Sequence, residues 1–398
     1  MHLTVITHKK CWRADDSPTG FVTDGGFPLQ MEAISELFSS TELVVPCETR
    51  GAGTGVSPVR GKSMRVTPIS MPKGKRFVRK LGLAIWLLSN GPTIWRSVRK
   101  ADAVHTPIPG DVGTFGMIFA LLLRKRLFVR HCGNWLEPRS IAEKIWKWSL
   151  IKLAGNRIVV FATGGADEPP SKRNPNIRWI FSTSVRNREI SEDAVREYPT
   201  VSDLRLIVVC RQEPRKGTII AIEAMPGLIE RFEKVSLDVV GDGSELERLR
   251  RRSKELGLNG SVNFHGKVPQ AEVKALLERA HIFCFPTSAS EGFPKVVIEA
   301  LAAGLPVVTT RVSVLPKLIE NGGGILLDEP TPDSLANAVA EIWSDPCVFT
   351  RLSSEAVRTT KEYSLEEWGS FIGRSLRASW ELGALDDETL ESRREAYQ

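Results

Sequence analysis

Short apolar runs recur along the whole chain and alternate with stretches whose apolar residues fall on one face of a helix. In the first half these runs lie at residues 3–7, 43–46, 103–105, 127–130, 158–162 and 177–181. A second series follows at residues 204–210, 235–240, 262–264, 282–286, 306–310 and 324–327. Continuously apolar runs separated by helices are typical of parallel strands that are buried on both faces of a sheet. The pattern therefore predicts an α/β protein with two successive doubly wound, Rossmann-like sheets.

The length of the chain supports this division into two domains. At 398 residues the chain is longer than a single hydrophobic core usually serves. We predict an N-terminal domain over residues 1–190 and a C-terminal domain over 203–365, joined by a charged linker. Residues 366–398 are predicted to form a helix that packs back toward the first domain, followed by a polar tail. We expect the two domains to face each other across a cleft that binds the ligand.

Composition and charge narrow the class of protein. With 42% hydrophobic and 25% charged residues the chain is an ordinary globular protein. A net charge of +7 favours anionic partners, or serves solubility alone. The six cysteines form no C-x-x-C pair and are typical of buried thiols in a reducing compartment. Without a signal-peptide pattern or an apolar run of about 20 residues, we expect a cytoplasmic protein.

The segment at residues 288–304 carries the most chemical information. A polar loop precedes a helix that is predicted to begin at Pro294, run through Ala303 and end at Gly304. Glu291 lies in the loop, and Glu299 lies inside the helix. The free N–H groups at a helix start bind phosphates, and a carboxylate further along the helix is a suitable acceptor for ribose hydroxyls. The alternative is a capped amphipathic helix with a glutamate that faces solvent.

Two cations follow the first strand of the second domain. Arg211 comes directly after the apolar run, and Lys216 precedes Gly217 and a helical stretch. The carboxyl end of a parallel strand is where such sheets bind ligands. Two cations placed there can neutralise a diphosphate leaving group. The alternative is a turn whose two cations face solvent. The acidic helix and the basic loop, however, both suit a ligand that carries a phosphate group.

The order of these motifs resembles a known family. Residues 210–217, 240–243, 265–268 and 291–299 follow one another at the spacing of the C-terminal domain of retaining glycosyltransferases of the GT4 family, which have the GT-B fold. The resemblance covers about residues 204–340. It implies a nucleotide-diphosphate sugar as donor and no catalytic metal. It also implies donor-site roles for Arg211 and Lys216 (diphosphate), Glu291, Gly292 and Phe293 (sugar), Glu299 (ribose) and Val268 (base).

Two features of the chain bear on this resemblance. Members of the family often carry a Pro-Glu pair after the next strand, whereas here Lys317 follows Pro316, so the contacts at that place are open. Gly241 and Gly243 suggest a dinucleotide fingerprint, but the third glycine and a helix start are missing, which argues against NAD. Asp15 and Asp16 are adjacent in a polar loop and form no D-x-D metal motif.

The first domain resembles the family more weakly. Gly25 and Gly26 precede a helix predicted over residues 26–38, and glycines there allow a phosphate or a sugar to approach the backbone. His131 ends a strand, and the resemblance implies that it faces the donor sugar; with Glu291 it is the predicted catalytic pair. His105 also ends a strand and is the weaker candidate. Both histidines, and the glycine loop, also have a purely structural interpretation.

Two basic stretches contain tryptophans. Residues 73–100 include Phe77, Trp86 and Trp95, and residues 141–153 include Trp146 and Trp148 among lysines. Basic amphipathic helices with tryptophan are typical of peripheral contact with an anionic membrane. The alternative is a core-facing stripe with a solvated basic face. No nucleic-acid-binding module is recognisable.

These observations favour a retaining glycosyltransferase that moves a sugar from a UDP- or GDP-sugar to an acceptor hydroxyl, in the assembly of a polysaccharide or a glycolipid. The expected partners are the nucleotide sugar, a sugar or lipid-linked acceptor, and the inner face of the cell membrane. An epimerase with the same fold, or a sugar-nucleotide-binding subunit without catalysis, are the alternatives. The identity of the sugar, the base and the acceptor depends on pocket contacts that the sequence does not define.

Overall fold

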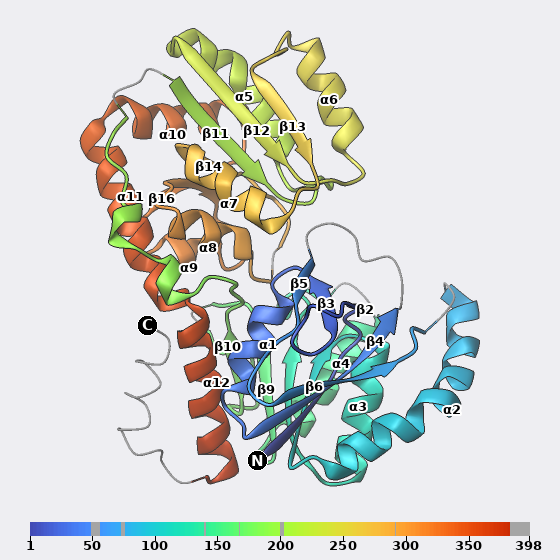
Figure 1. Cartoon of the computed structure of the whole chain (residues 1–398). Helices are drawn as coiled ribbons and strands as arrows, with labels where there is room; N and C mark the ends of the chain where they lie inside the picture. The colour runs from blue at the N-terminus through green and yellow to red at the C-terminus, as the bar shows by residue number, and fades with distance from the viewer. Residues whose placement is uncertain are drawn as a thin grey trace. The chain divides into compact units, whose positions relative to one another are not determined.

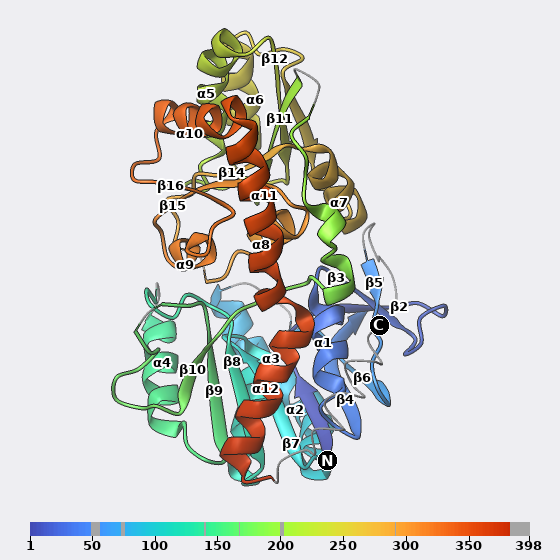
Figure 2. The same cartoon turned by 90° about the vertical axis from the view of Figure 1, so that its left-hand side faces the viewer.

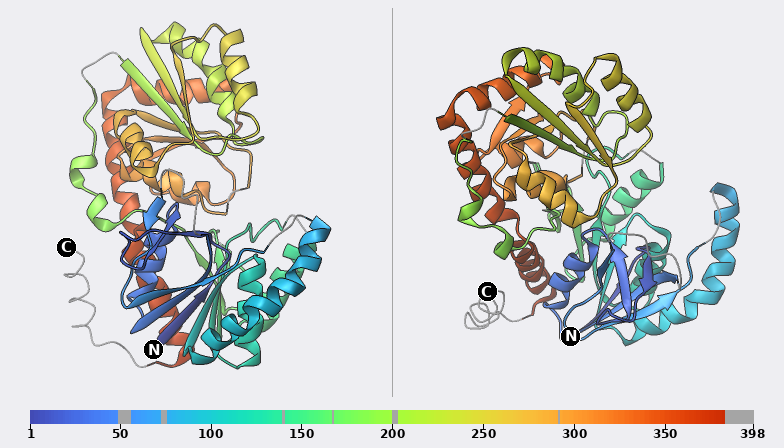
Figure 3. Two further views of the ribbon diagram at one scale, coloured as in Figure 1. Left: turned by 45° about the vertical axis from the view of Figure 1, so that its right-hand side comes forward. Right: turned by 45° about the horizontal axis from the view of Figure 1, so that its top comes forward.

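The structure is a computed structural model that describes residues 1–48, 56–72, 76–138, 141–166, 168–199, 203–290 and 292–382. The chain divides into two compact units. The first contains Met1–Phe181 together with the helix that begins at Leu365, and the second contains Ser182–Ser364. Each unit is built around one sheet with helices on both faces (Figure 1, Figure 3).

The first unit has a sheet in the order β10-β9-β8-β7-β1-β4-β2-β3-β5, and β6 pairs with β4. From β10 to β4 all neighbouring strands are parallel. The short strands β2, β3 and β5 extend the sheet and include antiparallel pairs. The strands are β1 (His2–Ile6), β2 (Cys11–Arg13), β3 (Phe21–Asp24), β4 (Ser40–Glu48), β5 (Val56–Pro58), β6 (Met64–Ile69), β7 (Ala103–Ile108), β8 (Arg126–His131), β9 (Ile158–Thr163) and β10 (Ile177–Ile180).

Helices cover both faces of this sheet. Helices α2 (Arg76–Lys100), α3 (Asp111–Leu122) and α4 (Ile141–Leu153) contribute to the core on one face. Helices α1 (Phe27–Ser35) and α12 (Leu365–Trp380) lie side by side (Figure 2) and contribute to the core on the other face. The side chain of Trp368 on α12 is fully buried in this core. The C-terminal helix therefore completes the hydrophobic core of the N-terminal unit.

The second unit has a wholly parallel sheet in the order β13-β12-β11-β14-β15-β16. Helices α5, α6 and α10 pack on one face, and α7, α8 and α9 pack on the other. The strands are β11 (Asp203–Val209), β12 (Lys234–Val240), β13 (Val262–Gly266), β14 (Ile282–Phe285), β15 (Val307–Thr310) and β16 (Gly324–Leu327). The helices are α5 (Thr218–Arg231), α6 (Leu246–Glu255), α7 (Gln270–Arg279), α8 (Lys295–Ala302), α9 (Leu315–Ile319), α10 (Pro332–Ser344) and α11 (Pro346–Thr360).

The predicted α/β class with two doubly wound sheets is confirmed, and each predicted apolar run coincides with a strand. The predicted helix at residues 26–38 was wrong in its bounds, because α1 ends at Ser35. Backbone and side-chain hydrogen bonds between Ser39 and Met1 draw the chain into a turn before β4 begins. The sequence interpretation also missed β2, β3, β5 and β6, which are short or carry polar residues.

Candidate functional site

The loop after β11 is fixed by a buried glutamine. Gln212 is 1% exposed, and its side-chain amide donates to the carbonyls of Cys210 (3.1 Å) and Val240 (3.0 Å). Its side-chain carbonyl accepts from the hydroxyl of Thr218 at 2.7 Å, at the start of α5. The loops after β11 and β12 are thereby joined at the carboxyl edge of the sheet, where parallel sheets bind ligands.

The same loop is also joined to the loop that precedes α8. The carbonyl of Arg215 accepts hydrogen bonds from the N–H groups of Ser288 (2.9 Å) and Ala289 (3.2 Å) and from the hydroxyl of Thr287 (3.0 Å). In return, the guanidinium of Arg215 donates to the carbonyl of Ser288 at 2.6 Å. The predicted basic segment and the predicted acidic segment are therefore neighbours through their backbones.

The two predicted cations lie on this joined loop. The guanidinium of Arg211 is 76% exposed and forms an ion pair of 2.9 Å with Glu213. Lys216 is half-buried and precedes Gly217, which has φ +84°. A side chain at Gly217 would place its Cβ 2.0 Å from the carbonyl oxygen of Pro286, so only glycine allows this close approach to the end of β14.

Helix α8 begins one residue later than predicted. Pro294 is the N-cap and not the first helical residue, since its backbone has ψ 93°, outside the helical region. The helix ends before Gly304, which takes the expected left-handed conformation with φ +69°. Glu291 lies outside the described residues. Gly292 and Phe293 are half-buried, and the ring of Phe293 lies 5.9 Å from that of Tyr363, centroid to centroid.

Glu299 is half-buried on α8 and accepts a hydrogen bond of 2.5 Å from the hydroxyl of Ser184. Burial raises the pKa of this carboxyl group above its usual value. The hydrogen bond from Ser184, the side chain of Gln270 and the charge of Lys295 act in the opposite direction. A desolvated carboxylate with acceptor capacity left over is suited to bind hydroxyl groups.

Val268 follows β13 and is half-buried against the same hydrophobic core as α7 and α8. Sequence reasoning missed Gln212, Arg215 and Ser184. The position of Gln212, three residues after the end of β11, is the one available signal. Arg215 acts through its backbone carbonyl and through a guanidinium bond to a backbone carbonyl, and Ser184 lies in the last part of the predicted N-terminal domain, so neither carries a signal in the sequence.

In the first unit, the glycine loop and one of the predicted histidines lie on elements that are directly joined. Gly25 has φ +67°, and Gly26 is the N-cap of α1. The buried side chain of Gln30 in the first turn of α1 accepts a hydrogen bond of 3.0 Å from Arg130 near the end of β8. The guanidinium of Arg130 also lies 5.3 Å from the ring centroid of Trp368. This contact anchors the start of α1 beside the strand that ends in His131.

His131 is 1% exposed and lies edge-on to Trp135, with ring centroids 5.2 Å apart. Neither ring nitrogen has a hydrogen-bond partner of normal geometry among the described residues, although the backbone of Gly133 is near. Burial lowers the pKa of His131, so the ring is neutral at physiological pH. His131 ends a parallel strand, and the carboxyl ends of parallel strands are where such sheets bind ligands.

His105 is fully buried in the sheet. Its ring stacks on Phe128 with centroids 4.1 Å apart, and Nδ1 lies 3.1 Å from the carbonyl oxygen of Phe128. Burial, followed by the charge of Arg130, lowers the pKa of His105 to about 3. The weaker candidate of the two histidines is therefore a neutral core residue.

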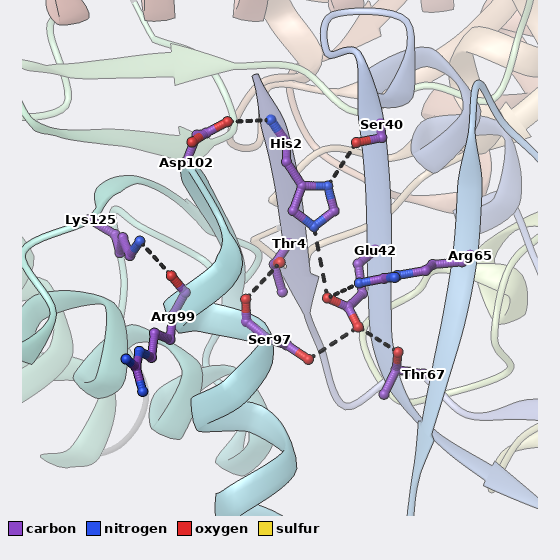
Figure 4. Close-up of polar contacts among 10 residues, drawn as sticks. All are labelled: His2, Thr4, Ser40, Glu42, Arg65, Thr67, Ser97, Arg99, Asp102 and Lys125. Carbon is purple, nitrogen blue, oxygen red and sulfur yellow. Dashed lines mark hydrogen bonds and ion pairs between the residues drawn. The ribbon is translucent and has the colours of Figure 1, made fainter.

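A second polar cluster lies at the opposite, amino edge of the first sheet (Figure 4). The buried carboxylate of Glu42 on β4 accepts hydrogen bonds from the hydroxyls of Thr67 (2.6 Å) and Ser97 (3.1 Å), and it pairs with Arg65 at 3.1 Å. Burial opposes ionisation, but these hydrogen bonds prevail and lower the pKa of Glu42. The cluster ties β4, β6 and α2 together.

Two further properties concern metal binding and membrane spans. Within the part of the chain that the structure describes, no three His, Cys, Asp or Glu side chains lie close enough together to hold a metal ion. None of the described helices combines the length and the apolar composition needed to cross a bilayer.

Residues 193–362 match the family Glycosyl transferases group 1. The match falls on the part of the chain where the resemblance was found in the sequence, and it confirms that resemblance. The crystal structure of HepE from Anabaena in complex with UDP and glucose has a TM-score of 0.66 to this chain at 17% identity, covering 94% of this chain and 98% of that one. This likeness confirms the predicted GT-B fold.

Two curated relatives are more similar in sequence. The chain is 30% identical over 181 residues to the phosphatidyl-myo-inositol mannosyltransferase of Mycobacterium leprae, covering 45% of this chain and 47% of that protein. It is 32% identical over 204 residues to the GDP-mannose-dependent alpha-(1-6)-phosphatidylinositol monomannoside mannosyltransferase of Mycolicibacterium smegmatis, covering 49% and 50%. The chain thus spans about half the length of the curated relatives it matches.

Proposed function

We propose, from the match of residues 193–362 to the Glycosyl transferases group 1 family, that this protein is a retaining glycosyltransferase. It transfers a sugar from a UDP- or GDP-sugar to an acceptor hydroxyl. The sequence relatives named above include a GDP-mannose-dependent enzyme, and the structural relative holds UDP and glucose. Both support a nucleotide-diphosphate sugar as the donor.

The observation that carries the proposal is the junction at Arg215, which holds the basic loop after β11 against the loop that precedes α8. Because the loop that carries Arg211 and Lys216 is joined to the loop that leads into α8, we assign these two cations and the N–H groups at the start of α8 to one diphosphate. Charge stabilisation of the leaving diphosphate by fixed cations and N–H groups performs the task for which other enzymes use a metal ion. We therefore include no metal in the proposed reaction.

The remaining donor contacts are assigned by the same logic. Glu299 binds the ribose, Glu291 with Gly292 and Phe293 binds the sugar, and Val268 lies beside the base. In the first unit, the neutral ring of His131 offers one donor and one acceptor to the sugar, since an imidazole without charge carries one of each. Gly25 and Gly26 leave the backbone open to a phosphate or to the acceptor.

We propose a lipid-linked or polysaccharide acceptor and a peripheral contact with an anionic membrane. Helices α2, α3 and α4 of the first unit carry strongly exposed apolar side chains, with Leu88 79% and Ile141 78% exposed, and Lys144 and Lys152 on α4 are also exposed. The tryptophans were predicted together as membrane-contact residues, but they differ in exposure. Trp148 is 62% exposed, whereas Trp86 is buried and donates a hydrogen bond to the carbonyl of Ser70. The side chain of Phe77 lies outside the described residues.

Titration calorimetry and thermal shift with UDP, GDP, UDP-glucose and GDP-mannose test the donor site, because a ligand that binds only the folded state raises the melting temperature. We expect one nucleotide sugar to bind, Glu299→Ala to weaken nucleotide binding, and Glu291→Ala mainly to lower turnover. Glu341→Ala, at an exposed position of α10, is the matched control. Binding of no nucleotide, or equal behaviour of all three variants, would refute the assignment.

A product assay separates the proposed reaction from the alternatives. A glycosyltransferase releases the nucleoside diphosphate and transfers labelled sugar to an acceptor. An epimerase would convert the sugar without releasing the diphosphate, and a binding subunit would do neither. For the membrane contact, flotation with phosphatidylglycerol vesicles should exceed flotation with phosphatidylcholine vesicles, and Leu88→Ser with Trp148→Ser should reduce it; no difference between the two vesicles would contradict this contact.

A further inference from the structure

The segment that enters the second unit, residues 182–190, is held against helices α7 and α8. Val185 is 6% exposed and belongs to the same hydrophobic core as these helices, and Ile190 packs on that core. The ammonium group of Lys274 on α7 lies 3.9 Å from the carboxylate of Glu189. The N–H of Val185 donates to the hydroxyl of Thr183 at 3.1 Å, which fixes the local turn. The position of the intervening Ser184 is therefore defined by packing on both sides.

Ser184 reaches a carboxylate that is 115 residues away in the sequence. Its hydroxyl donates to Oε1 of Glu299 at 2.5 Å, a short hydrogen bond of the charge-assisted kind. An ionised carboxylate offers about four acceptor positions, of which Ser184 takes one. A donor that holds one oxygen limits rotation of the carboxylate and leaves the other positions to a ligand. A serine placed in this way prepares the group for binding before the ligand arrives.

We propose that Ser184 is a positioning residue of the nucleotide site, which holds Glu299 in the orientation that accepts hydrogen bonds from the ribose hydroxyls of a nucleoside diphosphate. This inference rests on the proposed function and assigns to residues 182–190 a role in nucleotide affinity. Ser184 acts through Glu299 and does not touch the ligand.

The charges around Glu299 predict that the pH dependence of nucleotide binding also reports on Ser184. Burial raises the pKa of Glu299, and the negative charge of Glu189 acts in the same direction. Ser184, Gln270 on α7 and Lys295 on α8 lower it. Removal of the Ser184 hydroxyl therefore raises the pKa further. Since the ionised form accepts the ribose hydroxyls, binding by the variant should weaken at a higher pH than binding by the wild type as the pH falls.

Calorimetry with ribose and dideoxyribose nucleotides tests the proposal. UDP, GDP and their 2′,3′-dideoxy counterparts are titrated into full-length wild type, Ser184→Ala, Ser184→Thr and Glu299→Ala between pH 5.5 and 8.5. We expect Ser184→Ala to bind the ribonucleotide about tenfold more weakly, as the loss of one charge-assisted hydrogen bond requires. Its affinity for the dideoxy nucleotide should change little, because the hydroxyls that Glu299 binds are missing from that ligand. Ser184→Thr should restore most of the affinity.

Ser191→Ala is the matched control, since Ser191 directly follows this segment and its hydroxyl bonds only to Asp193 among the described residues. Equal or tighter ribonucleotide binding by Ser184→Ala would overturn the proposal and make the serine a bystander or a competitor. An equal loss for the ribo and dideoxy ligands would also overturn it, since that pattern indicates general damage to the site. If the wild type binds neither UDP nor GDP, the proposed function itself fails, and this assignment fails with it.

Discussion

Arg196 offers a stringent test of how the second unit is held together. Its guanidinium donates to the carbonyls of Ala303 (2.9 Å), Leu277 (3.0 Å) and Ala280. Leu277 lies in the last turn of α7, and Ala280 and Ala303 are the C-caps of α7 and α8. One cation thus satisfies carbonyl groups that two helices leave open at their ends, and it meets the negative end of both helix dipoles.

The magnitude follows from these contacts. Burial lowers the pKa of Arg196 to about 10, which leaves the group charged at neutral pH. A hydrogen bond to a charged group contributes about 1.5–3 kcal/mol, but these bonds are only partly buried and water replaces part of each, so we take about 1 kcal/mol for each of the bonds. Arg196→Ala should then destabilise the second unit by roughly 3 kcal/mol and lower its Tm by about 6–12 °C. Arg196→Lys keeps the charge but not the planar fork, and it should lose about half as much.

Calorimetry gives the Tm, and hydrogen exchange read by mass spectrometry localises the effect to the last turns of α7 and α8. Arg188→Ala is the control, because Arg188 is exposed in the same segment. A Tm within about 1 °C of the wild type, or faster exchange spread evenly over both units, would refute the capping argument.

Three further predictions concern the first unit and α5. Because hydrogen bonds lower the pKa of Glu42, its contribution is present above about pH 4.3 and is lost as the pH falls through the lower folded pKa. Urea unfolding should show that Glu42→Gln lowers the free energy of unfolding by about 2–4 kcal/mol at pH 7. The free energy of unfolding of this variant should also fall less than that of the wild type as the pH is lowered below about 4.3; an equal fall in both proteins would contradict this. The lowered pKa of His105 means that its protonation favours the unfolded chain below about pH 6.5. Between pH 6.5 and 4 the free energy of unfolding of His105→Gln should therefore fall less than that of the wild type. An equal fall in the two proteins over this pH range would refute the prediction. A Cβ added at Gly227 inside α5 meets no atom within 4 Å, so Gly227→Ala should raise the free energy of unfolding by about 1 kcal/mol; destabilisation in the same assay would refute it.

The buried parallel strands could be predicted from the sequence because burial on both faces leaves a continuous apolar run. The strands that were missed lack this signal for a physical reason. β2 and β5 contain three residues each, and β6 mixes Arg65 and Thr67 with apolar residues because its polar side chains serve the Glu42 cluster. β6 alternates apolar residues with Arg65 and Thr67, so it lacks the continuous apolar run by which the buried strands were predicted.

The same reasoning separates the site residues that the sequence predicted from those that it missed. Arg211 and Lys216 follow a strand end, and Glu299 lies on a helix whose start can bind phosphate, so residue type and place suggest a ligand. Ser184 acts through a hydroxyl on another segment, and Arg215 acts through bonds to and from backbone groups, so their chemistry is independent of any motif. Contacts of this kind form only when distant segments meet, and a single sequence carries no record of them.

The segment from Ser182 to Pro199 links the two main arguments. Its first residues were predicted to end the N-terminal domain and the rest to form a charged linker, yet it delivers Arg196 to the ends of α7 and α8 and Ser184 to the carboxylate inside α8. Both contacts bear on the same short helix, whose N–H groups and glutamate are assigned to the nucleotide. A helix of only two turns has few internal hydrogen bonds to keep its register, so contacts at its C-terminal end determine how well its side chains are placed. The stability of α8 and the orientation of Glu299 are therefore two consequences of one docked segment. A change that loosens the segment should reach the nucleotide through α8 even when it lies far from the diphosphate.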